Sequence, residues 1–268
     1  MLQFAGGLPS QVRARRVVVV ADRAPHRSNG TDHRYRPEAC TEAARELFGA
    51  DPAWVPQDPG VRAALRTAED RDFPTALAPG GWVAPRTAAS PGPALAGTDL
   101  CDAASWPGDL AETLAACHRL PTADVRVRLP DRPRGSLEVP LRHGWLGYEA
   151  GDLGPRPFLH QLDFYLHFPP PESAEWYSRP ALEAAAMGCV VVMPERYAGL
   201  YGDAAVYCGR TEVAPLIERY RADPALFAEQ SRRARSVVAR AHDPALLVER
   251  IMEMLPVTGV AAPALTSA

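Results

Sequence analysis

Two glutamates, Glu175 and Glu183, stand with seven residues between them, beside residues that favour the start of a helix. Ser178 is a suitable N-cap, and Pro180 is tolerated in a first helical turn, where the N–H groups have no partner within the helix. Such N–H groups and the positive end of the helix dipole attract a phosphate or diphosphate. A carboxylate beside them accepts hydrogen bonds well, so Glu183 suits a ribose diol and Glu175 suits sugar hydroxyls. These residue types predict a site for a sugar nucleotide.

The surrounding stretch predicts one βαβ unit that would position these residues. It reads as a buried strand at 163–168, a Pro-rich turn, a helix over about 178–187, a stop at Gly188 and a second buried strand at 189–193. A helix that follows a parallel strand begins at the carboxyl end of that strand, which is where ligands bind in open α/β sheets. The acidic pair is therefore expected at this edge of a sheet.

The run EWYSRPALEAAAMGCVVV, which begins at Glu175, resembles the Glu-x7-Glu donor motif of retaining GT-B-fold glycosyltransferases of family 4 and its relatives. The family pattern reads E-x-F-G-R-x-x-L-E-A-M-A-x-G-x-P-V-V. The resemblance implies that Glu175 contacts the transferred sugar and Glu183 the ribose. The main chain near Ser178 and Arg179 would contact the diphosphate, and Tyr177 replaces the family's Phe. Two glutamates alone at this spacing are more often surface charges, but here the Leu, the Ala run, the Gly stop and the apolar strand are also in register.

The sequence departs from the family at two basic positions. The family usually places an Arg just after the first strand of the second domain and a Lys a few residues later, whereas this chain has Thr98 and Ser105 or its neighbours there. The leaving diphosphate gains negative charge that must be stabilised, so this loss is expected to reduce transition-state stabilisation. Arg179 and Arg196 are the candidate substitutes, and Arg179 has the better position.

Composition excludes several classes of function. All 29 basic residues are Arg, so there is no lysine for a Schiff base or a P-loop. The net charge of -3 gives no electrostatic case for nucleic acid. Five cysteines without a C-x-x-C pair indicate reduced thiols, and the apolar runs are too short to span a bilayer, so we expect a cytoplasmic protein without a transmembrane segment.

The order of the remaining elements indicates the fold class. Strands are predicted at 16–21, 54–56, 94–97, 124–129, 139–145 and 204–207, and helices at 38–48, 59–67, 107–120, 157–162, 195–200, 212–221, 224–240 and 244–255. Such alternation predicts an α/β protein with a doubly wound, Rossmann-like parallel sheet, and by resemblance this is a GT-B C-terminal domain.

The expected domain organisation is uneven. We predict a partial, acceptor-side N-terminal Rossmann-like domain at 1–85, a linker at 86–93, a donor-binding domain at 94–255 and a disordered tail at 256–268. About 85 residues are few for an independent core. By resemblance, much of a full N-terminal domain is missing, and a second chain is one partner that would complete it.

The sequence leaves more than one function open. The first hypothesis is a retaining glycosyltransferase that needs no metal or other cofactor and moves a sugar from a nucleotide sugar, such as a UDP- or GDP-sugar, to an unknown glycan, lipid or small-molecule acceptor. The alternative is a degenerate, non-catalytic donor-domain-like protein that acts as an accessory or binding module. A nucleotide-sugar epimerase is a third option that no feature favours. No G-x-S-x-G motif supports a hydrolase.

Overall fold

The computed structural model describes residues 14, 16–26, 33–65, 72–78, 82, 86, 88–101, 114–117, 120, 123–130, 145–170 and 177–254. Glu175 and the predicted tail at 256–268 lie outside the described residues, as does most of the predicted strand at 139–145. Of the predicted helix at 107–120, the described part includes a helical segment at 114–117.

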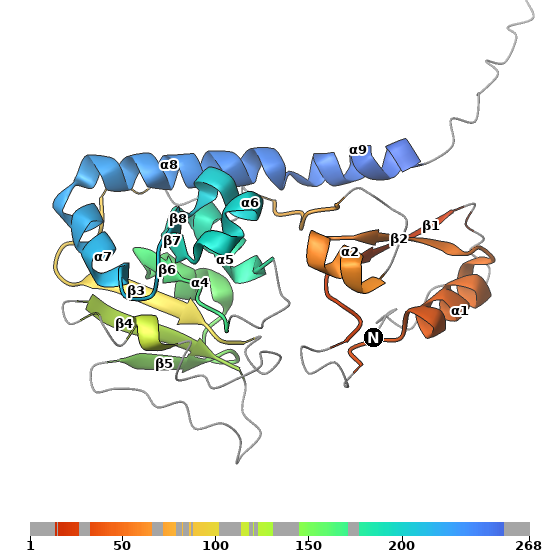
Figure 1. Cartoon of the computed structure of the whole chain (residues 1–268), viewed down its shortest axis with the longest axis horizontal. Helices are drawn as coiled ribbons and strands as arrows, with labels where there is room; N and C mark the ends of the chain where they lie inside the picture. The colour runs from red at the N-terminus through yellow and green to blue at the C-terminus, as the bar shows by residue number, and fades with distance from the viewer. Residues whose placement is uncertain are drawn as a thin grey trace, which may run out of the picture.

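A six-stranded, entirely parallel sheet forms the larger part of the molecule (Figure 1). Its strand order is β5-β4-β3-β6-β7-β8. The strands are β3 (Ala94–Asp99), β4 (Ala123–Leu129), β5 (Leu146–Glu149), β6 (Phe164–Leu166), β7 (Val190–Met193) and β8 (Val206–Tyr207). The order reverses between β3 and β6, so the crevice of a doubly wound sheet is expected at their carboxyl ends. This topology confirms the predicted Rossmann-like α/β fold.

Helices cover both faces of this sheet. The described helices around it are α4 (Pro155–His160), α5 (Arg179–Met187), α6 (Ala198–Tyr201), α7 (Val213–Ala222) and α8 (Pro224–Ala241), with 3-10 turns η3 (Glu195–Tyr197) and η4 (Gly202–Ala204) around α6. Helix α9 (Pro244–Met254) follows α8 and extends beyond the sheet (Figure 1). In β7, Val191 and Met193 join the core under α4, α5 and α8, whereas Val190 and Val192 join the core under α7. A strand buried on both faces explains the unbroken apolar run in the sequence.

Gly97 lets β3 and β4 approach each other beneath α4. A Cβ at this position would lie 2.6 Å from the carbonyl oxygen of Arg126 and 2.8 Å from a methyl group of Leu162. Because this oxygen belongs to the backbone of the paired strand β4, it cannot move away without disturbing the pairing of β3 and β4. We expect Gly97→Ala to lower the free energy of unfolding by about 1–3 kcal/mol, as measured by urea denaturation.

The matched control for this substitution is Gly199→Ala on α6. A Cβ there meets no heavy atom within 4 Å, and alanine is the better helix former. This variant should keep or slightly increase the stability of the wild type. Equal stability of the two variants would show that the β3–β4 contact tolerates a methyl group.

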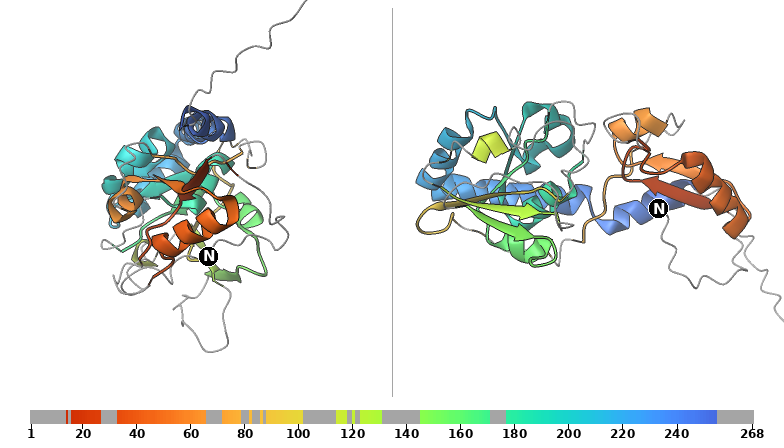
Figure 2. Two further views of the ribbon diagram at one scale, coloured as in Figure 1. Left: turned by 90° about the vertical axis from the view of Figure 1, so that its right-hand side faces the viewer. Right: turned by 90° about the horizontal axis from the view of Figure 1, so that it is seen from below.

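A smaller unit contains the N-terminal elements. Strands β1 (Val17–Ala21) and β2 (Pro52–Pro56) pair in parallel, flanked by helices α1 (Pro37–Phe48) and α2 (Pro59–Leu65). Helix α8 lies along the larger unit and α9 continues along the smaller one (Figures 1 and 2). Arg250 of α9 donates a hydrogen bond from Nη1 to the carbonyl oxygen of Asp72 at 3.3 Å. The predicted domain boundaries remain predictions.

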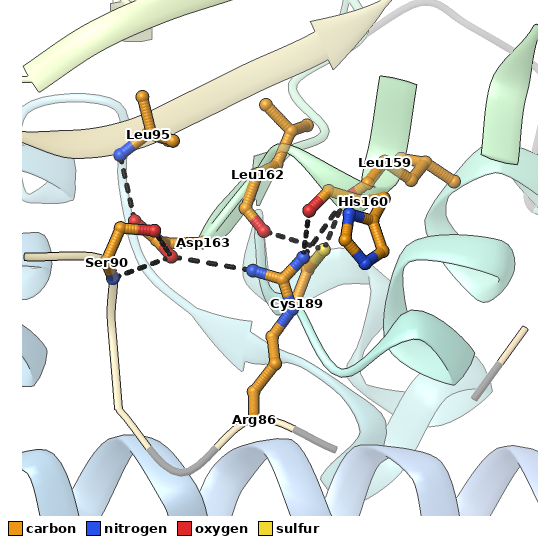
Figure 3. Close-up of polar contacts among 8 residues, drawn as sticks. All are labelled: Arg86, Ser90, Leu95, Leu159, His160, Leu162, Asp163 and Cys189. Atoms are coloured by element: carbon orange, nitrogen blue, oxygen red, sulfur yellow. Dashed lines mark hydrogen bonds and ion pairs between the residues drawn. The ribbon is translucent and has the colours of Figure 1, made fainter. Parts of the chain in front are cut away.

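The predicted linker is bound to the start of β6 through Asp163, whose residue surface is 1% exposed (Figure 3). The carboxylate accepts hydrogen bonds from Ser90 N at 3.0 Å, Ser90 Oγ at 2.8 Å and Leu95 N at 3.0 Å. Arg86 Nη1 lies 3.5 Å from the same carboxylate, and its Nη2 donates to the carbonyl oxygens of Leu159 and His160. Asp163 therefore joins the linker to β3 and β6 at their amino ends, away from the candidate site.

Most predicted elements are present, with shifts at their ends. The predicted helix at 195–200 is a 3-10 turn followed by the short helix α6, and the predicted strand at 204–207 shortens to β8 because η4 takes its first residue. The described strand nearest to the predicted one at 139–145 is β5, which begins at Leu146. None of the described helices is long and apolar enough to cross a membrane. The five cysteines are free thiols.

Candidate functional site

Helix α5 begins as the sequence predicts. Ser178 is the N-cap with extended backbone angles, and its Oγ accepts a hydrogen bond from Ala181 N at 3.3 Å. Arg179 and Pro180 are the first two helical residues, and the helix ends at Gly188 with a left-handed φ of 83°. These caps fix the start of α5 after β6. Because β6 lies next to β3, the start of α5 lies near the point where the strand order reverses.

Glu183 and Arg179 lie together on the first turns of α5. Glu183 is 4% exposed, whereas the Arg179 side chain is 64% exposed. Arg179 Nε donates a hydrogen bond to Glu183 Oε1 at 2.8 Å. Burial raises the pKa of Glu183, and the hydrogen bond and charge of Arg179 oppose that rise. The pair places a buried acceptor and an exposed cation at the edge of the sheet.

A second ion pair adjoins this site at the ends of β3 and β4. Arg128 Nη1 lies 2.9 Å from Asp99 Oδ2 and 3.0 Å from Cys101 Sγ, and Arg128 Nε donates to the carbonyl oxygen of Leu153 at 2.9 Å. The charges of Asp99 and Arg128 both act on Glu183. Sequence reasoning missed Arg128, although the alternation of Val and Arg in β4 could have indicated a charged residue near the strand end.

The backbone donors at the start of α5 are fewer than the sequence suggested. Ser178 N donates to the hydroxyl of Tyr201 at 2.6 Å, Ala181 N is capped by Ser178, and Pro180 has no N–H. Among the described residues, the N–H of Arg179 is the first-turn donor left for an anion. Tyr201 is buried, and a buried hydroxyl needs a partner, which explains a contact that no local pattern predicts. A diphosphate here would depend more on the Arg179 side chain than on backbone donors.

Tyr177 packs at the side of the site. Its ring lies 5.7 Å from that of Tyr201 and 5.9 Å from that of His242, measured between ring centroids. Burial and the carboxylates of Asp58 and Asp72 raise the pKa of Tyr177 to about 12, so its hydroxyl stays protonated at neutral pH. The structure thus brings Tyr177, Ser178, Arg179 and Glu183 to one helix start, while Glu175 falls outside the described residues.

Arg196, the other candidate cation, braces the turn that follows β6. Its Nη2 donates to the carbonyl oxygens of Pro169 at 3.3 Å and Pro170 at 3.0 Å, and its guanidinium lies 4.9 Å from the centre of the Tyr197 ring. Arg210 Nη2 reaches the Pro169 oxygen at 3.5 Å. These contacts hold the beginning of the segment that leads to Glu175.

His167 makes the region beneath this turn sensitive to acid. Burial, and then the charge of Arg196, lower its pKa to about 3. In the unfolded chain a histidine has its ordinary pKa of about 6.5. Between pH 6.5 and pH 3 the unfolded chain therefore binds a proton at this residue that the folded chain does not bind, and folding stability falls as the pH drops below 6.5. Because of His167, we expect the free energy of unfolding to be about 2 kcal/mol lower at pH 5 than at pH 7.5.

Denaturation of His167→Gln at both pH values checks this prediction. The variant should lose less stability than the wild type on going to pH 5. His160→Gln, which changes an exposed histidine on α4, should keep the steep dependence. An unchanged dependence in His167→Gln would contradict the expected role of burial.

Comparisons with known proteins bear on the fold. No protein-family model matches the sequence, and a sequence search of curated proteins finds no match. Anabaena HepE, solved in complex with UDP-glucose, is similar with a TM-score of 0.61 at 12% identity over 89% of this chain and 71% of HepE. TarM of S. aureus, in a complex that includes UDP, is similar with a TM-score of 0.53 at 11% identity over 89% of this chain and 50% of TarM. At this low identity the similarities bear on the fold alone, and this chain shares the Rossmann-like α/β fold of these proteins.

Proposed function

We propose that this chain binds a nucleotide sugar at the start of α5 and is the donor-binding part of a retaining glycosyltransferase that needs no metal. The observation that carries the proposal is the buried Glu183 carboxylate, which Arg179 contacts at 2.8 Å on the first turns of a helix that follows β6. A buried carboxylate at this edge of a doubly wound sheet is suited to accept both hydrogen bonds of a ribose diol.

The charged residues supply the remaining roles. Arg179 is exposed and close to the helix start, so it can turn from Glu183 towards a diphosphate once the ribose satisfies the carboxylate. Its guanidinium and its backbone N–H would then stabilise the charge that grows on the leaving diphosphate. Glu175 would contact the transferred sugar, as the motif implies. Tyr177 and Ser178 shape the entrance to the helix.

The solved structures support a choice of donor for the first test. HepE was solved with UDP-glucose and TarM with UDP, so a UDP-sugar is the first candidate, and a GDP-sugar is the second. The acceptor would be a glycan, lipid or small molecule bound opposite the donor. A second chain that completes the unit around β1 and β2 is also part of the proposal.

A non-catalytic binding module is the second candidate, and one observation favours it. The cations near the site are engaged in structural contacts: Arg128 pairs with Asp99, and Arg196 holds two proline carbonyls. Arg179 is then the cation best placed for phosphate chemistry among the described residues. This module would bind a nucleotide sugar weakly and would transfer nothing.

Calorimetry of the whole chain with UDP-glucose, a GDP-sugar and the free nucleotides tests the proposal. Saturable binding of one nucleotide sugar is the expected result. Cleavage of the bound donor, detected as free nucleotide, would indicate a transferase, whereas a binding module would leave the donor intact. Absence of binding at millimolar concentrations of every ligand would contradict both candidates.

A further inference from the structure

Tyr201, on the short helix α6, contacts the start of α5 through its hydroxyl and is 2% exposed. The hydroxyl accepts a hydrogen bond from Ser178 N at 2.6 Å and donates one to the carbonyl oxygen of Ser178 at 3.3 Å. A single hydrogen bond would satisfy a buried tyrosine hydroxyl. Here the hydroxyl instead engages both backbone polar groups of one residue, and that residue is the N-cap of α5.

The Tyr201 ring is packed in the core of the larger unit, together with residues of α5 and α8. Its centroid lies 6.2 Å from that of Tyr197, at an interplanar angle of 81°, and 5.7 Å from that of Tyr177. Burial raises the pKa of Tyr201 well above its usual value, so the hydroxyl keeps the proton that it donates to Ser178. The packed ring therefore presents its hydroxyl oxygen to the start of α5 in a defined position.

The residue that Tyr201 holds determines how α5 begins. Ser178 has extended backbone angles, with φ at -105° and ψ at 110°, and its Oγ caps Ala181 N. Its carbonyl oxygen also accepts a hydrogen bond from Leu182 N at 3.2 Å, one turn into the helix. Arg179 follows directly, so the position of its N–H and of its side chain depends on the backbone of Ser178.

We infer that Tyr201 is a positioning residue for the diphosphate end of the nucleotide-sugar site. It acts through Ser178 and not by contact with the substrate: its hydroxyl holds the N-cap backbone, and this backbone directs Arg179 towards the diphosphate. The same contact occupies the N–H of Ser178, which leaves the N–H of Arg179 as the donor for a phosphate oxygen. The inference rests on the proposed function, because it concerns the same site at the start of α5.

Tyr201→Phe is the variant that tests this role. It removes one oxygen and keeps the ring that packs in the core, and urea denaturation of the full chain checks that the variant is folded. Tyr35→Phe is the matched control. Tyr35 lies in the smaller unit, and its half-buried hydroxyl also makes a hydrogen bond of 2.6 Å with the backbone, to the carbonyl oxygen of Arg23.

The readouts are amide hydrogen exchange at Ser178 without ligand and the Kd values for UDP-glucose and for uridine, which has no phosphate. In Tyr201→Phe we expect exchange at Ser178 to accelerate about tenfold, because its N–H loses its acceptor. The Kd for UDP-glucose should rise about fivefold, as expected for the loss of roughly one hydrogen bond, whereas the Kd for uridine should stay the same. Tyr35→Phe should change none of the three quantities.

The outcomes distinguish the inference from the function on which it rests. If the wild type binds UDP-glucose and Tyr201→Phe binds it equally well, the inference fails while the proposed function stands. Equal losses of affinity for UDP-glucose and uridine would also overturn the inference, because the hydroxyl would then support the fold and not the diphosphate end in particular. If the wild type binds no nucleotide sugar, the proposed function fails and the role of Tyr201 in that site fails with it.

Discussion

Asp163→Ala is expected to lower the free energy of unfolding by about 3–5 kcal/mol, the largest effect on stability that we predict. The substitution removes an acceptor that serves three donors, Ser90 N, Ser90 Oγ and Leu95 N, at 2.8–3.0 Å. It also leaves the Arg86 guanidinium, whose side chain is mostly buried, without its carboxylate. A buried charge and buried donors that lose their partner cost much more than the intact pair contributes.

Urea denaturation measures this effect, and Asp124→Ala is its control. Asp124 also faces an arginine, Arg126, but at 3.7 Å and with a half-exposed carboxylate. An exposed ion pair contributes little, so Asp124→Ala should change stability by less than about 1 kcal/mol. A small loss in Asp163→Ala would show that the linker is not held to the sheet by this carboxylate.

Glu183→Ala is expected to weaken the binding of UDP-glucose by about 100-fold, since hydrogen bonds to a charged group contribute about 1.5–3 kcal/mol. The change removes the acceptor proposed for the ribose diol and leaves Arg179 without its partner on α5. Glu183→Gln should lose less, because the amide keeps one oxygen acceptor but no charge. Calorimetry of the folded variants gives the three affinities.

Glu218→Ala is the matched control for this experiment. It breaks another Glu–Arg pair on a helix, with Arg221 at 3.3 Å on α7. This variant should bind UDP-glucose as the wild type does. If Glu183→Ala also keeps the affinity of the wild type, the ribose role of Glu183 is wrong, and a glycosyltransferase site at α5 loses its main support.

The central βαβ unit could be predicted because its signals are local. Ser178 as N-cap, Pro180 in the first turn and Gly188 at a left-handed position fix the ends of α5. The short, Val-rich apolar run after it indicates a buried strand. The Glu-x7-Glu spacing then places Glu183 on the helix. These features depend on residues within one or two turns of each other.

The contacts that shape the site depend on residues far apart in sequence. The hydroxyl of Tyr201 occupies Ser178 N, and Arg128 pairs with Asp99 across two strands. Arg196, a candidate cation from the sequence, instead donates hydrogen bonds to the carbonyl oxygens of Pro169 and Pro170, which follow β6. Such pairings follow from the packing of whole elements, and no spacing in the sequence indicates them.

The most direct test is the mapping of UDP-glucose onto the chain by backbone amide chemical shifts. Binding at the proposed site should shift the resonances of Ser178, Arg179 and Glu183 and leave those of Arg45 and Gly49, at the C-terminal end of α1 in the smaller unit, unchanged. Shifts that cluster away from the start of α5, or no shifts at saturating ligand, would contradict the claim that this helix start holds a nucleotide sugar.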